Sequence, residues 1–100
     1  MVLVVTLTVR KAETAAFHEF ERQAARIMAR HGGVIERVVV IDSRDDEDTF
    51  KEVHIVTFPN ADSFEAYRAD DALRPIAHLR AQAVVSTVIW VGRAGLNYTQ

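Results

Sequence analysis

The residues best suited to proton chemistry are a glutamate and a histidine two positions apart, Glu52 and His54. Both fall in a run from Phe50 to Phe58 whose composition favours a β-strand. Because residues two apart on a strand point the same way, the two side chains are expected to be neighbours. Such a pair can serve as a general base and the group that orients it. The alternative is a structural histidine that is hydrogen-bonded inside the fold or at its rim.

Several aromatic side chains could wall a pocket for a small apolar or aromatic ligand. These candidates for ligand contact are Phe20, Phe58, Phe64, Tyr67 and Trp90. For Tyr67 the alternative is a core position in which its hydroxyl finds a polar partner. Trp90 is the single tryptophan, and the alternative for it is a subunit interface, where tryptophan is enriched.

Two arginines, Arg74 and Arg80, flank the last predicted helix and could hold a carboxylate or oxyanion of such a ligand. The alternative is that they form surface ion pairs, which contribute little free energy. The four histidines include no closely spaced pair that would place two metal ligands on one helix face. We therefore expect no metal site.

Composition argues against several classes of partner. A net charge of −2 is unfavourable for binding the phosphates of nucleic acid. The absence of cysteine excludes disulfides, thiolate metal sites and cysteine nucleophiles. No apolar run approaches the roughly 20 residues that span a bilayer, and the first residues lack the pattern of a signal peptide. We expect a cytoplasmic protein that binds neither nucleic acid nor membrane.

The elements that must position these residues alternate between strand and helix patterns. Strand composition is found at 2–9, 34–41, 50–58 and 84–91, and helical apolar spacing at 17–28, 64–67 and 73–83. Right-handed crossovers fold this order into a four-stranded antiparallel sheet with the helices on one face. The prediction is an α+β, ferredoxin-like βαββαβ fold. Residues 1–100 form one domain, with the first and third strands central.

Both faces of the predicted sheet are apolar, although helices can cover only one of them. In the first strand both alternating sets are rich in apolar residues, and in the last strand the second set includes Val88 and Trp90. A monomer rarely leaves such a surface in water. Packing of two identical faces is the simplest cover, so we expect a homodimer whose sheets pack face to face. The alternative is that β-branched residues supply only strand propensity on a solvated face.

A resemblance to the dimeric α+β-barrel superfamily is carried by the segment 52–67, which reads EVHIVTFPNADSFEAY. Asp70-Asp71, Leu73, Leu79-Arg80 and the stretch Arg30–Gly33 fit the same pattern. The segment is similar to two branches: the antibiotic-biosynthesis-monooxygenase-like proteins and an uncharacterised family with the signature strand, Phe-Pro-Ser, helix, Tyr. The resemblance implies a dimeric barrel over nearly the whole chain. Its motifs mark the fold more than an activity, because members include cofactor-free oxygenases, isomerases and haem-degrading enzymes.

Two functions from different classes remain open. The first is a small cofactor-independent monooxygenase or isomerase that acts on an aromatic or polyketide-like ligand, with His54 moving a proton. The second is a non-catalytic, dimeric ligand-binding or stress-associated module with the same pocket. Neither requires a cofactor. Haem binding is a third alternative, since His78 lies near the haem-binding histidine of haem-degrading members. Those members carry a tryptophan about where this chain has Tyr67.

Overall fold

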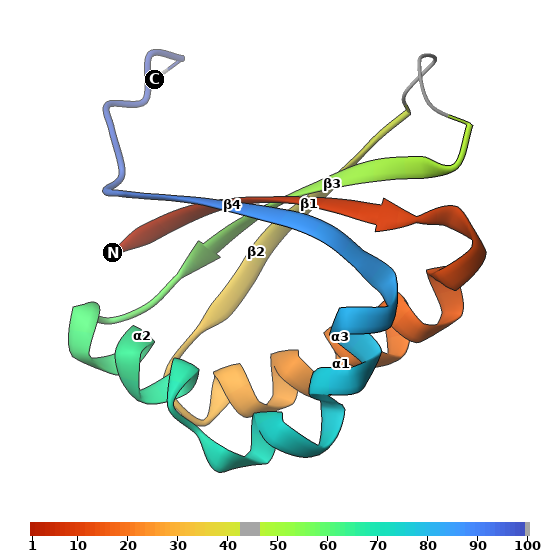
Figure 1. Ribbon diagram of the computed structural model, residues 1–100. Coiled ribbons are helices and arrows are strands. Elements are labelled where there is room, and N and C mark those ends of the chain that lie inside the picture. Colours follow the sequence, from red (N-terminus) through yellow and green to blue (C-terminus); the bar gives the residue numbers. More distant parts are fainter. Residues whose placement is uncertain (43–46, 100) are drawn as a thin grey trace.

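The computed structural model describes residues 1–42 and 47–99, which form four strands and three α-helices (Figure 1). The strands are β1 (Val2–Arg10), β2 (Val34–Ile41), β3 (Thr49–Thr57) and β4 (Val84–Gly92). The helices are α1 (Thr14–Ala29), α2 (Ala61–Arg68) and α3 (Ala77–Ala83), with short 3₁₀ helices η1 (Lys11–Glu13) and η2 (Asp71–Ile76). The polar segment between β2 and β3 lies partly outside the described residues.

The strands form one antiparallel sheet in the order β2-β3-β1-β4, so β1 and β3 are central, as the sequence predicts. The helices all lie on one face of this sheet, below it in Figure 1. The opposite face carries no helix from the described part of the chain. The predicted ferredoxin-like α+β fold is therefore confirmed.

The core lies between the sheet and the apolar stripe of α1. Phe17, Phe20, Ala24, Ile27 and Met28 are all buried and recur at three- and four-residue steps, as expected for an amphipathic helix. They pack with buried residues of the strands and of the segments that follow β3. This packing fixes which residues of α1 lie over the inner face of the sheet.

Local hydrogen bonds set the starts of the helical segments. Asn60 caps α2 and Asp70 caps η2, each accepting from a backbone amide of its first turn at 2.8 and 2.9 Å respectively. Thr14, a residue type that is common at helix caps, is instead the first residue of α1. Its hydroxyl donates to the carbonyl of Lys11 at 2.7 Å. The segment before α1 is a 3₁₀ turn, and this places the hydroxyl beside a carbonyl rather than a free amide.

Strand β2 contains a β-bulge that the alternation of its residues does not reveal. The register shifts between Ile35 and Arg37, so Glu36 is an extra residue in this strand. Strict alternation predicts that Ile35 and Val38 face opposite ways. After the bulge Val38 pairs with His54, and both Ile35 and Val38 lie on the helix side of the sheet. The bulge therefore adds a second side chain of β2 to the surroundings of His54.

The helix-free face is apolar, in line with the alternation in the first and last strands. Val4, Ile55, Val88 and Trp90 share this face through the pairing of β1 with β3 and β4. Trp90 is 67% exposed and Val88 48% exposed. The residues that follow β4 also rise on this side of the sheet (Figure 1).

Candidate functional site

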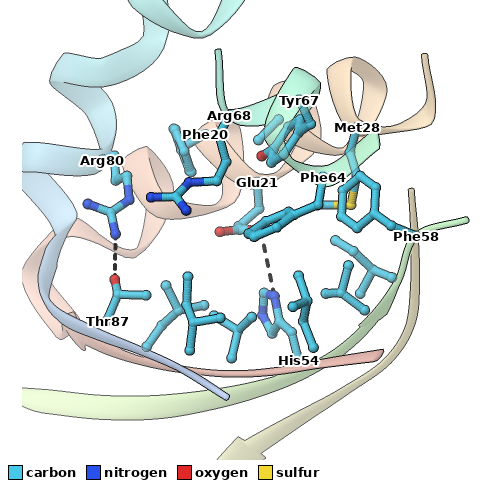
Figure 2. Close-up of a pocket in the computed structure, with 17 residues that line it drawn as sticks. Phe20, Glu21, Met28, His54, Phe58, Phe64, Tyr67, Arg68, Arg80 and Thr87 are labelled. Atoms are coloured by element: carbon cyan, nitrogen blue, oxygen red, sulfur yellow. Dashed lines mark hydrogen bonds and ion pairs between the residues drawn. The ribbon is translucent and has the colours of Figure 1, made fainter. Parts of the chain in front are cut away.

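A cavity of about 170 Å³, here called the inner cavity, lies between the sheet and the helices (Figure 2). Most of its wall is apolar and comes from all four strands, α1 and α2. The polar side chains that line it are Glu21, His54, Tyr67, Arg68, Arg80 and Thr87. A preformed apolar space with a few converging polar groups is the usual form of a small-molecule site.

His54 lies at the floor of the inner cavity, on the central strand β3. It is 4% exposed and Glu52 is 7% exposed, and both point to the helix side, as predicted from their spacing. The His54 ring nitrogen Nε2 lies 2.8 Å from Glu52 Oε1. Because an ionised carboxylate only accepts hydrogen bonds, Nε2 is the donor in a contact with ionised Glu52, and Nδ1 is the nitrogen left for exchange of a proton.

Glu21, on α1, faces the other nitrogen of the same ring. Its Oε2 atom lies 3.8 Å from His54 Nδ1, and Figure 2 shows this pair joined across the cavity. Analysis of the sequence missed Glu21, although a signal was present. It lies one position after Phe20 and three before Ala24, within the buried stripe of α1, where a carboxylate is out of place. A charged residue at a core position of a helix marks a candidate site.

The carboxyl of Glu21 is electrostatically perturbed. Burial raises its pKa above the ordinary value of 4.5, since water is removed from the charged form. The charge of His54 when its ring is protonated, and the charge of Arg80, oppose this rise, while Glu52 adds to it. Burial, with the charge of Glu21 nearby, also raises the pKa of Tyr67 to about 12. Tyr67 therefore stays a neutral phenol at physiological pH and can donate a hydrogen bond.

Two guanidinium groups lie on the helix side of the inner cavity. Arg80 donates to the Thr87 hydroxyl, and Arg68 lies over the ring of Phe64, 5.4 Å from its centroid (Figure 2). Both arginines line the cavity. The positive charge of Arg80 is close enough to offset part of the rise in the pKa of Tyr67. The inner cavity therefore combines an apolar body with positive charge on one side.

Six of the ten predicted site residues meet at the inner cavity. They are Phe20, His54, Phe58, Phe64, Tyr67 and Arg80. Glu52 lies behind His54. Arg74 is exposed and pairs with Asp71 at 3.4 Å, and His78 is exposed on α3; neither lines the inner cavity. Trp90 lies on the helix-free face, away from this cavity, which agrees with its alternative placement at an interface.

A second, more open cavity of about 310 Å³ lies on the far side of Glu21 and is here called the outer cavity. Its lining is Phe17, His18, Glu21, Arg22, Ile35, Val38, Glu52 and His54. Glu21, Ile35 and His54 belong to both cavities. Glu21 and His54 thus lie where the two cavities meet.

The described ranges, 1–42 and 47–99, hold no group of three His, Asp or Glu side chains able to bind a metal ion. No helix among them is long and apolar enough to cross a membrane.

The fold defines an α+β, ferredoxin-like protein that is similar in structure to proteins of the antibiotic-biosynthesis-monooxygenase-like group. The chain belongs to the family described as "Domain of unknown function (DUF1330)", whose pattern matches residues 2–94. Comparison with curated protein sequences finds no match.

Solved structures agree on the fold. The cofactor-independent oxygenase SnoaB from Streptomyces nogalater is 22% identical, with 95% of each chain covered and a TM-score of 0.62. A protein of unknown function from Rhodopseudomonas palustris, RPA0582, is 17% identical, with 89% of this chain and 78% of that chain covered and a TM-score of 0.69. A candidate antibiotic biosynthesis monooxygenase from Nitrosomonas europaea is 22% identical, with 91% and 96% covered and a TM-score of 0.60. The likeness that the sequence suggests is therefore confirmed at the level of the fold, while the neighbours include both an oxygenase and a protein of unknown function.

Proposed function

We propose that this protein binds a small acidic aromatic molecule in the inner cavity and removes a proton from it with His54. The observation that carries the proposal is the buried pair of Glu52 and His54 at a preformed cavity. Glu52 holds Nε2, so Nδ1 is the free base. Glu52 also stabilises the imidazolium that forms when the ring accepts a proton.

The size and charge of the inner cavity define the ligand class. An apolar cavity of about 150 Å³ is sufficient for benzene, so about 170 Å³ accommodates one aromatic ring rather than a fused polyketide skeleton. Arg80 and Arg68 favour an anionic product. A phenol or an enolisable ring ketone meets both requirements, because loss of its proton creates an oxyanion.

Two reactions begin with this proton transfer. In an isomerase, the proton returns to a different atom of the ligand. In a cofactor-independent monooxygenase, the carbanion formed at an activated CH₂ group reacts with dioxygen. The CH₂ becomes C=O, and its two hydrogens leave with the second oxygen atom as water, so no external reductant is consumed. SnoaB, a cofactor-independent oxygenase with a similar fold, lends support to the second reaction.

The proposal is tested with p-nitrophenol, a one-ring acid whose phenolate absorbs visible light. We expect the wild-type protein to bind it as the phenolate at a pH where the free probe is mostly neutral. This corresponds to a lowering of the bound probe's pKa by about one unit. In His54→Gln the probe should still bind but remain neutral.

The matched control is His78→Ala, which changes an exposed histidine that does not line the inner cavity. It should ionise the probe as the wild type does. If the wild type binds the probe without ionising it, the protein is a binding module and His54 is structural.

We further propose that one such domain per chain, residues 1–100, assembles as a homodimer through the helix-free faces. Four strands about 4.8 Å apart, with about nine residues rising 3.3 Å each, present a face of about 600 Å². A stable interface buries about 800 Å² per partner. The segment that follows β4 rises on the same side of the sheet (Figure 1). Its exposed apolar residues, Leu96 and Tyr98, can supply the remainder. A cytoplasmic location stays a prediction.

A further inference from the structure

The proton that His54 removes from a ligand must leave a buried position before the base can act again. His54 is almost fully enclosed, and Glu52 already occupies Nε2. The remaining nitrogen, Nδ1, faces Glu21 at 3.8 Å. This distance is longer than a hydrogen bond, so a small rotation of the Glu21 side chain is needed to bring the two atoms into contact.

Glu21 has the freedom to make that movement. Its side chain is 22% exposed, whereas that of Glu52 is 9% exposed. Within the described residues the Glu21 carboxylate forms no hydrogen bond, and its close polar contact is the one with His54 Nδ1. Glu21 also lines both cavities, while Glu52 lines only the outer one. One carboxylate can therefore face His54 in one rotamer and the outer cavity in another.

We propose that Glu21 carries protons between His54 and solvent through the outer cavity, an inference that rests on the proposed function. In the step, the N–H bond at His54 Nδ1 breaks and an O–H bond forms at Glu21 Oε2. Glu21 then turns to the outer cavity and passes the proton to a base in solvent. No electrons are transferred, and both residues return to their starting protonation states.

The charges around Glu21 decide how readily its carboxylate accepts a proton. From β3 it faces His54 and Glu52, from α3 Arg80, and from α2 Tyr67. From its own helix, His18 and Arg22 line the outer cavity beside it. Burial is the largest influence and raises the pKa of Glu21, which makes the carboxylate a better proton acceptor than an exposed glutamate.

The test follows two signals after rapid mixing with p-nitrophenol: phenolate absorbance, and proton release reported by a pH indicator too large for either cavity. In the wild type, we expect both signals to rise together. In Glu21→Gln, phenolate should still form, because His54 is intact, but proton release should slow by about tenfold or more. Added formate, a small carboxylate, should restore the rate of release by entering the outer cavity.

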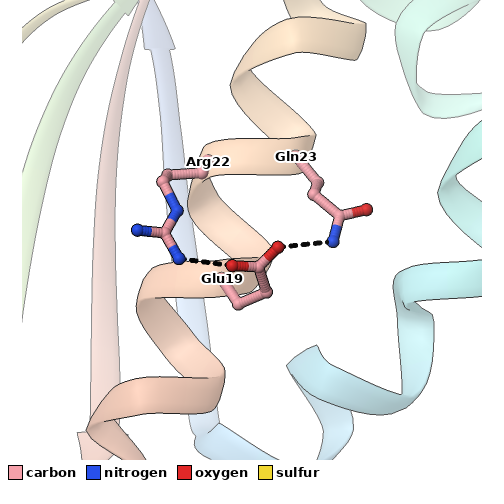
Figure 3. Close-up of polar contacts among 3 residues, drawn as sticks. All are labelled: Glu19, Arg22 and Gln23. Atoms are coloured by element: carbon pink, nitrogen blue, oxygen red, sulfur yellow. Dashed lines mark hydrogen bonds and ion pairs between the residues drawn. The ribbon is translucent and has the colours of Figure 1, made fainter.

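Glu19→Gln is the matched control, since it makes the same change two positions earlier on α1. The Glu19 carboxylate accepts from Arg22 and Gln23 and lines neither cavity (Figure 3). It should leave both signals unchanged.

Three outcomes would overturn the relay. One is release in Glu21→Gln at the wild-type rate. Another is slowed release in Glu52→Gln alone, which would assign the path to Glu52. The third is a wild type that forms phenolate but releases no proton, because His54 would then keep it. Absence of phenolate in the wild type would instead refute the proposed function itself.

Discussion

Three ionisable side chains, Glu21, Glu52 and His54, lie together between the sheet and α1. Charged groups are seldom buried unless they are paired, because removal of water costs free energy. The pair of Glu52 and His54 meets this cost through a 2.8 Å hydrogen bond. Glu21 has only a longer contact to offset it. At this site the chain therefore gives up stability, as expected where a residue is kept for function.

Glu21→Gln should stabilise the protein at neutral pH. The raised pKa means that the native state prefers the protonated carboxyl. As pH rises above the ordinary value of 4.5, the native state loses stability relative to the unfolded chain until the raised pKa is passed. Glutamine does not titrate, so its stabilising effect should be absent in acid and grow as the pH rises toward neutrality. Thermal unfolding of both proteins across this pH range measures the difference in stability. A difference that is the same at every pH would contradict the prediction.

The neighbourhood of Glu52 and His54 could be predicted from sequence because it depends only on the two-residue period of a strand. The contact between His54 and Glu21 could not. It depends on the angle and depth at which α1 crosses the sheet, which the packing of many side chains decides together. Arg68 was missed for a related reason: its long side chain reaches the cavity from a helix position that reads as solvated.

At the scale of elements, the turn between α1 and β2 holds one wall of the inner cavity in place. Gly32 has a φ of 75°, a left-handed conformation that favours glycine at the end of a helix. A Cβ on Gly33 would lie 2.3 Å from Met28 Cγ and 2.6 Å from Phe58 Cε1. Met28 and Phe58 both line the cavity. The two glycines thus couple the end of a helix to the shape of the site.

Gly33→Ala should therefore lower both stability and ligand binding. The added methyl group overpacks the core, which costs about 1–3 kcal/mol, and displaces Phe58 toward the cavity. Urea unfolding and p-nitrophenol titration measure the two effects. Gly92→Ala is the matched control, because a Cβ there meets nothing within 4 Å. If Gly33→Ala is as stable as Gly92→Ala and binds p-nitrophenol equally well, the turn accommodates the added methyl group and the prediction is wrong.

Element order and strand pairing followed from the sequence because hydrophobic periodicity and handed crossovers leave few other arrangements. The bulge at Glu36 did not, since an extra residue in a strand leaves no mark in a run such as Val38-Val39-Val40. That one residue changes which side chains of β2 surround His54, so an error at the level of an element becomes an error in the composition of the site.

At the scale of the whole molecule, the helix-free face decides whether the domain is complete alone. Trp90 and Val88 are exposed there, next to partly covered residues of the central strands such as Val4 and Ile55. Apolar area of this extent is stabilised when a second copy removes it from water, at about 25 cal/mol per Å². The inner cavity is on the opposite face, so assembly need not disturb the chemistry.

A single charge on this face should separate the protomers without unfolding them. Val88→Asp places a carboxylate at a position that is 48% exposed in the isolated chain, so the monomer can keep it hydrated. In a face-to-face dimer the same carboxylate, and its copy across the two-fold axis, would lose water without gaining a partner. We expect the dimer dissociation constant to rise at least tenfold, about 1.4 kcal/mol. Sedimentation velocity across micromolar concentrations measures it.

Ala15→Asp adds the same charge on the exposed first turn of α1 and should sediment like the wild type. If the wild type itself sediments as one subunit, the face is solvated and its valines serve only strand propensity. If Val88→Asp remains a dimer, the interface lies elsewhere, and Trp90 needs another explanation.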